Sequence, residues 1–181
     1  MTDYAKNPAA AETAAAIRKA AGELEDQIIS WRRHLHAHPE VGAHEVQTSA
    51  FVREQLDKLG VPYRMVKGAR PEPYTAERPD FIGTGIIATI AGAAPGAYDE
   101  NGNPARRIAL RTDMDALPIR ERTDFDFKSQ NEGVMHACGH DCHMAMMLGA
   151  GRNHVACADR DLLGGLKDDA HLTVQFVAHL P

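Results

Sequence analysis

Apolar residues in the first sixty positions recur at the spacing of an α-helix. The large ones fall at i, i+4, i+7 and i+11, namely Leu24, Ile28, Trp31 and Leu35. This stripe predicts one amphipathic helix over residues 9–38, which Pro39 ends. Its alanine-rich start lacks large apolar groups, so we expect that part to project from the body. A second helix is predicted from near Glu45 to Gly60, since its apolar positions keep the same period: Val52, Leu56 and Leu59.

Two strands are predicted later in the chain. The β-branched run Ile86–Ile90 predicts the first, and Arg107–Arg111 predicts the second, which ends at Asp113. We expect these two strands to pair. Residues 67–80 contain three prolines and are predicted to form a loop. A helix over residues 144–158 and a third strand over residues 172–177 follow. This order of elements indicates an α/β layered domain.

Composition narrows the classes of partner. The 181 residues carry 20 basic and 25 acidic side chains, a formal net charge of -5, without a dense Lys/Arg block. This balance offers no surface for nucleic acid or anionic membranes and favours a small-molecule substrate. Three cysteines are too few for a secreted disulfide framework. We also find no signal peptide and no apolar run long enough to cross a bilayer, so we expect a cytoplasmic protein.

The densest chemistry lies in residues 136–143, which read His-Ala-Cys-Gly-His-Asp-Cys-His. The thiolate of Cys138 and the imidazole of His140 suit zinc or a similar divalent transition metal, and Gly139 lets the backbone aim both at one point. Three other interpretations are open: an incidental buried thiol, a Cys138 nucleophile with His140 as its base, and a redox pair of Cys138 with Cys142. The density of ligands favours the metal site.

Two aspartates, Asp113 and Asp115, lie where the second strand ends. In an extended backbone residues i and i+2 point to the same side, so we expect both carboxylates to face one crevice at the carboxyl ends of the strands. There they would bind a metal ion or fix the tautomer of a metal-binding imidazole. The alternative is a solvated turn after a strand, where aspartates are common.

Three histidines, His34, His36 and His38, come near the end of the first predicted helix. They can be a metal cluster, since residues 34 and 38 are one helical turn apart. We favour a partly buried, hydrogen-bonded imidazole at position 38, because His38 continues the apolar stripe at a helix end and no acidic ligand sits on that helical face.

Four segments together carry a family resemblance. They are Trp31–Glu40 (WRRHLHAHPE), Gly83–Ala88 (GTGIIA), Ala109–Ile119 (ALRTDMDALPI) and Gly133–His143 (GVMHACGHDCH). In this order they resemble the metal-dependent N-acyl-amino-acid amidohydrolases. That family includes hippurate hydrolase, indole-acetyl-amino-acid hydrolases and aminobenzoyl-glutamate hydrolases, and is related to aminoacylases and zinc carboxypeptidases.

The resemblance implies a zinc-peptidase-like layered domain, with helices flanking a mixed central sheet. It implies a site for two divalent ions (Zn, Mn, Co or Ni), in which Cys138 and His140 are ligands and Asp115 orients a metal-binding side chain. Three neighbours are implied to shape the site: His136, Asp141 and His143. The implied reaction is hydrolysis of the amide bond of small N-acyl amino acids, in proteins that dimerise through a lid domain.

The resemblance also predicts what residues 1–181 lack. In the family, a strand ending in a Phe-Gln-Pro-Ala-Glu-Glu type sequence supplies the general base, whereas residues 172–181 read LTVQFVAHLP. The paired glutamates would then belong just beyond Pro181. We therefore expect the N-terminal portion of a catalytic metal-binding domain, incomplete, without the lid domain and inactive by itself. The alternative is a noncatalytic or vestigial binding module of the same fold.

Overall fold

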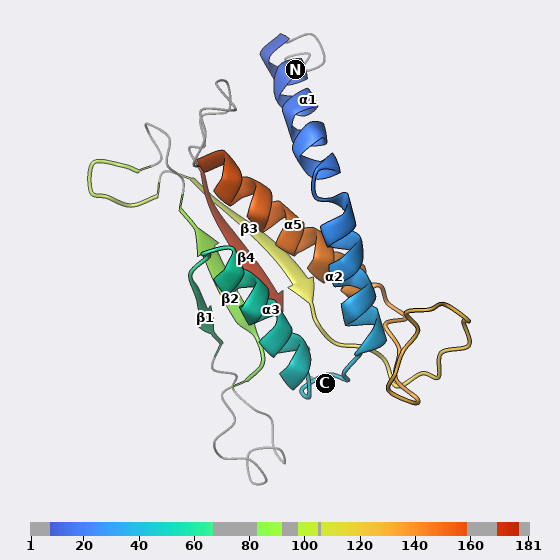
Figure 1. Cartoon of the computed structure of the whole chain (residues 1–181). Helices are drawn as coiled ribbons and strands as arrows, with labels where there is room; N and C mark the ends of the chain where they lie inside the picture. The colour runs from blue at the N-terminus through green and yellow to red at the C-terminus, as the bar shows by residue number, and fades with distance from the viewer. Residues whose placement is uncertain (1–7, 67–82, 92–97, 105, 159–169, 178–181) are drawn as a thin grey trace, which may run out of the picture.

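The computed structural model describes residues 8–66, 83–91, 98–104, 106–158 and 170–177 (Figure 1). The helices in these ranges are α1 (Pro8–Gly22), α2 (Glu25–Ala37), α3 (Val46–Lys58) and α5 (His140–Ala158). The strands are β1 (Tyr63–Met65), β2 (Ile86–Ile90), β3 (Arg106–Asp113) and β4 (Ala170–Val177). The mixed sheet with flanking helices confirms the predicted fold class. The loop predicted over residues 67–80 lies outside the described residues.

The strands form one sheet in the order β1-β2-β4-β3. β2 pairs antiparallel with β1 and with β4, and β3 pairs parallel with β4. The prediction that β2 pairs with β3 is therefore wrong, since β4 lies between them. The physical reason is the connection: parallel strands need a long crossover, and α5 provides it between β3 and β4.

One face of the sheet is covered by helices. On β2 the side chains of Ile86, Ala88 and Ile90 are buried while Thr89 is exposed, the alternation of a half-buried strand. Helices α3 and α5 contact each other and both contact β2, so they lie on the same face. Helix α2 packs alongside α5 (Figure 1). The core between these layers includes Trp31, Leu35, Val52, Leu56, Met144, Leu148 and Phe176.

The first helical segment is divided in two, which corrects the prediction of one helix over residues 9–38. A turn at Glu23 and Leu24 separates α1 from α2, and the Leu24 amide donates to the carbonyl of Ala21 at 3.1 Å. Leu24 is buried, whereas Ile17 in α1 is half exposed. The break lets Leu24 and the rest of the apolar stripe pack while α1 extends away from the sheet, as expected for the alanine-rich start (Figure 1).

The other two predicted helices are present, with one shifted boundary. Helix α3 follows Glu45 and ends just before Gly60, which has φ +66°, as predicted. Helix α5 begins at His140, four residues before the predicted start at Met144. Residues 140–143, the second half of the His-Ala-Cys-Gly-His-Asp-Cys-His segment, therefore form the first turn of a helix and not a loop.

Candidate metal centre

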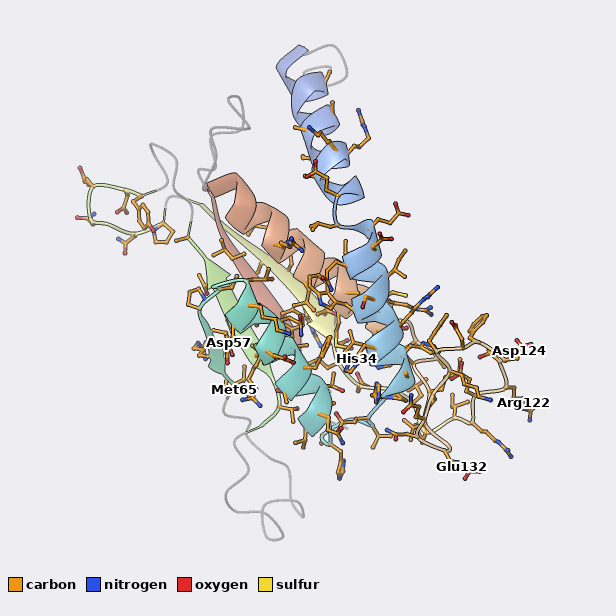
Figure 2. All side chains as sticks on the ribbon, in the orientation of Figure 1. His34, Asp57, Met65, Arg122, Asp124 and Glu132 are labelled. Carbon is orange, nitrogen blue, oxygen red and sulfur yellow. The ribbon has the colours of Figure 1, made fainter. Side chains whose placement is uncertain are left out.

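The site lies at the carboxyl end of β3. There the chain leaves the sheet at Asp113, passes through residues 114–139 and enters α5 at His140. Figure 1 shows this connection looping out beside the end of α2, and Figure 2 shows Arg122, Asp124 and Glu132 on its outer side. Gly139 has φ +80°, a left-handed conformation that glycine adopts without strain, and it turns the chain into the helix.

His140 is held by Asp115. Its Nδ1 donates a hydrogen bond to the backbone carbonyl of Asp115 at 2.8 Å and lies 3.1 Å from the carboxylate Oδ1 of the same residue. That Oδ1 atom is buried and has no hydrogen bond in the structure, so its contact with His140 is electrostatic. With Nδ1 engaged as a donor, the ring presents Nε2 as its lone-pair nitrogen.

Cys138 lies two residues before His140 and is exposed, while Cys142 is partly buried. Both are free thiols, so the structure contains no Cys138–Cys142 disulfide. The Cys138 thiol therefore remains open to a ligand. His143, one helical turn into α5, is also exposed, and its ring centroid is 6.0 Å from that of His140.

His136 is the unexpected member of the segment. It is 4% exposed, and neither ring nitrogen has a hydrogen-bond partner. Burial lowers the pKa of His136 from 6.5 to about 4, although the carboxylates of Asp141 and Asp115 act in the opposite direction. His136 is thus a neutral imidazole at neutral pH.

Within the described ranges, no three side chains of His, Cys, Asp or Glu lie together in an arrangement that could hold a metal ion.

The two aspartates do not share partners, contrary to the expectation of a common crevice. Asp113 accepts hydrogen bonds from Arg111, at 3.0 Å from Nη2, on the exposed side of β3. Asp115 is buried beside His140. The alternation rule fails because the regular strand ends at Asp113, so it does not govern the direction of Asp115.

A buried charge cluster next to the site was missed by sequence reasoning. Asp141, the residue after His140, accepts a hydrogen bond from Arg32 Nε at 2.9 Å and contacts Nδ1 of His36 at 2.8 Å. The other ring nitrogen of His36 lies 3.1 Å from Glu121 Oε1. We call Arg32, His36, Glu121 and Asp141 the His36 cluster. Its members come from three separate segments, so local sequence patterns gave no signal for it.

Glu121 anchors the outer end of this cluster. Burial acts to raise its pKa, but hydrogen bonds from the Thr123 hydroxyl, the Ser129 amide and His36 outweigh burial and lower the pKa of Glu121 from 4.5 to about 2. The Ser129 amide donates at 2.6 Å. Glu121 is therefore an ionised carboxylate fixed from several directions.

A second buried carboxylate, Glu45, lies at the start of α3. It is fully buried, and its Oε2 accepts a hydrogen bond from the Thr84 hydroxyl at 2.9 Å, while Oε1 has no partner. Ser49 donates to the Thr84 carbonyl at 2.7 Å. Burial raises the pKa of Glu45, and these contacts tie α3 to the Gly-Thr-Gly segment before β2.

The other two histidines near the end of α2, His34 and His38, do not join the site. His38 Nδ1 donates to the carbonyl of His34 at 2.7 Å, as predicted for a hydrogen-bonded imidazole at a helix end. The ring of His34 stacks on Phe51 of α3, with 4.2 Å between centroids; Figure 2 shows His34 in the region between the two helices. Burial lowers the pKa of His34.

Comparisons with known proteins show which proteins this chain resembles. Residues 109–163 match the Peptidase family M20/M25/M40. The chain is 37% identical over 161 residues to an N-acyl-L-amino acid amidohydrolase of Geobacillus stearothermophilus, covering 89% of this chain and 35% of that protein. It is 46% identical over 125 residues to the N-acetyldiaminopimelate deacetylase of Oenococcus oeni, covering 69% of this chain and 28% of the relative.

A solved structure agrees with these matches. The YXEP protein of Bacillus subtilis, described as a dinuclear metal binding peptidase from the M20 family, superposes with a TM-score of 0.63 at 29% identity, over 86% of this chain and 35% of that chain. Among the described helices, none combines the length and apolarity needed to cross a membrane. The chain is thus related in sequence and fold to the amidohydrolases and peptidases of the Peptidase family M20/M25/M40, and it spans about a third of the length of the relatives it matches.

Proposed function

We propose that residues 1–181 form the N-terminal part of the catalytic domain of a metal-dependent amidohydrolase. In this proposal Cys138 and His140 bind a divalent metal ion, and Asp115 orients His140. The observation that carries the proposal is the contact of His140 Nδ1 with the Asp115 carbonyl at 2.8 Å and carboxylate at 3.1 Å, two residues from the exposed Cys138 thiol.

The donor atoms fit such an ion. A metal-binding histidine commonly donates its second ring N–H to a carbonyl or carboxylate, which leaves the other nitrogen for the metal, and His140 has this arrangement. A thiolate together with an imidazole suits zinc, and the related ions Mn, Co and Ni are alternatives that the donor set permits. A bound divalent ion would supply a water of lowered pKa and polarise an amide oxygen.

The register of the sheet supports the same location for further catalytic groups. Asp113 of β3 is paired with Val177 of β4 in a parallel ladder, so both strands end at the edge of the sheet where Asp115 begins the site. Strand β4 therefore ends beside the site. In the proposed reaction, a glutamate at this edge of the sheet would take a proton from water and return it to the leaving amine.

The proposed substrates are N-acyl amino acids, and the proposal draws on the names of the relatives. These include an N-acyl-L-amino acid amidohydrolase and a deacetylase of N-acetyldiaminopimelate. A second metal ion, a cytoplasmic location and a homodimer of the whole protein belong to the same proposal. The free thiols at Cys138 and Cys142 are consistent with a reducing compartment.

Cobalt titration tests the proposed ligands. Co²⁺ bound by the Cys138 thiolate should give a thiolate-to-cobalt charge-transfer band that is absent in Cys138→Ala. Asp115→Asn should weaken Co²⁺ binding by about 10-fold, because it removes a group that orients a ligand. Asp113→Asn is the matched control and should bind as wild type, since Asp113 pairs with Arg111 instead. A band of unchanged intensity in Cys138→Ala would refute the ligand assignment.

The second candidate is a noncatalytic binding module of the same fold. The observation in its favour is that the described residues offer no group of three or more metal donors. The two candidates differ in one measurable property. A binding module predicts that the whole protein does not hydrolyse N-acetyl or N-benzoyl amino acids. The amidohydrolase predicts turnover of these substrates by the whole protein, and this turnover should be lost in Cys138→Ala.

A further inference from the structure

We propose that His36 is a positioning residue for residues 138–140, which carry the two proposed metal ligands. In this role the His36 cluster fixes the first turn of α5, and through it His140 and Cys138, against α2. The inference rests on the proposed function, because it concerns how the two proposed ligands are held. No member of the cluster is proposed to touch the metal ion.

The cluster contacts the site through Asp141. This residue directly follows His140 in the first turn of α5, and its side chain is 1% exposed. Its two side-chain hydrogen-bond partners, Arg32 and His36, belong to α2. A rotation of the α5 turn that carries His140 would therefore break two charge-assisted hydrogen bonds, at 2.9 and 2.8 Å.

The same cluster holds the connection between β3 and α5. His36 Nε2 reaches Glu121, which lies within residues 114–139 and is itself bound by Thr123 and Ser129. The end of α2 also binds this connection through its backbone, since the Gln130 amide donates to the Ala37 carbonyl at 2.8 Å. Helix α2 thus serves as a rigid support for both the connection and the start of α5.

The shape of the imidazole ring suits His36 to this position. Its two ring nitrogens face carboxylate oxygens from two different segments, Asp141 at 2.8 Å and Glu121 at 3.1 Å. One side chain of α2 therefore contacts both the first turn of α5 and the connection that precedes it. Removing the ring would take one polar partner from each of two buried carboxylates, which is unfavourable.

A purely structural role and a positioning role differ in what they predict for metal binding. A structural cluster would change the stability of the fold and leave the affinity for metal unchanged in the molecules that remain folded. A positioning cluster changes the geometry at Cys138 and His140 in folded molecules. The readouts that separate the two roles are the Co²⁺ affinity and the spectrum of bound Co²⁺, measured where circular dichroism shows the variant to be folded.

The test uses Co²⁺ titration of the 181-residue chain and its variants. His36→Gln should weaken Co²⁺ binding by about 10-fold and alter the thiolate-to-cobalt band. Glu121→Gln is a milder variant that keeps an oxygen acceptor for Thr123 and Ser129, and it should shift both readouts in the same direction. Glu54→Gln removes the exposed ion pair with Lys58 and is the matched control that should bind as wild type.

The outcomes are distinct. Wild-type affinity and spectrum in folded His36→Gln overturn the positioning role while leaving the proposed function intact. If His36→Gln does not fold, Glu121→Gln decides the question by the same two readouts. A wild-type chain that shows no thiolate-to-cobalt band overturns the proposed function and this inference together.

Discussion

Asp113 and Asp115 are two positions apart, yet their carboxylates meet different partners. Asp113 pairs with Arg111 on the same strand, where both side chains remain solvated. Asp115 lies just past the strand and is buried against His140. A surface ion pair of the first kind contributes little to stability, whereas a carboxylate that fixes an imidazole decides which ring nitrogen a metal ion can reach. Residue identity alone does not distinguish the two roles.

Glu45 offers a pH-dependent prediction at the same scale. Its pKa in the folded protein lies above the ordinary value of 4.5, chiefly because the side chain is buried. An acid with a raised folded pKa binds its proton more tightly in the folded state, so folding becomes less favourable as pH rises from 4.5 through the folded pKa. Glu45→Gln removes this ionisation. The free energy of unfolding of Glu45→Gln minus that of wild type should therefore be larger at pH 8 than at pH 4.5, because wild type loses stability over this range and the variant does not.

The measurement is chemical denaturation at the two pH values. Glu54→Gln, at an exposed position on the same helix, should show no comparable change with pH. A relative stability of Glu45→Gln that stays constant between the two pH values would contradict the assignment of a raised pKa.

At the scale of elements, α2 and α5 build the site together. Helix α5 carries His140 and Asp141 in its first turn, and α2 supplies Arg32 and His36. Neither helix could hold this arrangement alone, because each supplies only part of the charged groups. The turn into α5 depends on Gly139, which sits at φ +80° between the two proposed ligands.

Gly139→Ala tests the importance of that turn. An added Cβ would meet no atom within 4 Å, so the cost arises from the left-handed backbone alone and should be about 1 kcal/mol of stability. Gly102→Ala is the matched control, because Gly102 has φ +77° and the same open surroundings. Thermal denaturation should show similar losses for both variants, whereas Co²⁺ affinity should fall only in Gly139→Ala. Equal Co²⁺ affinity in the two variants would show that the Gly139 conformation does not aim the ligands.

At the scale of the whole molecule, the parallel pairing of β3 with β4 sets the location of the site. Both strands end at one edge of the sheet, which is where ligands bind in open α/β folds. The residues described at that edge provide Cys138, His140 and Asp115. Closed zinc sites use four protein ligands, so two strong donors are half of that number.

We therefore predict weak metal retention by residues 1–181 in isolation. After loading with Zn²⁺ or Mn²⁺ and extensive dialysis, the chain should keep much less than one equivalent of metal by elemental analysis. Cys138→Ala should lower even this residual binding, because it removes one of the two donors. Stoichiometric retention of either ion by the wild-type chain would mean that the described residues form a more complete site than two donors allow.

Local sequence determined much of this protein. The 3.6-residue period of apolar positions predicted the buried stripe from Leu24 to Leu35 and the face of α3, and short runs of strand-forming residues predicted β2, β3 and β4. The density of thiol and imidazole groups in residues 136–143 marked the candidate site, and the four motifs predicted the resemblance that the comparisons found. These features are readable because each depends on residues that are close in sequence.

The tertiary structure decided what depends on residues far apart in the chain. Strand β4 could be placed between β2 and β3 only once the α5 crossover was known, because pairing is a choice among distant partners. The His36 cluster joins positions up to 109 residues apart and therefore left no periodic signal. The different surroundings of Asp113 and Asp115 arose from the end of β3. Sequence specified the chemical groups available, and packing specified which of them meet.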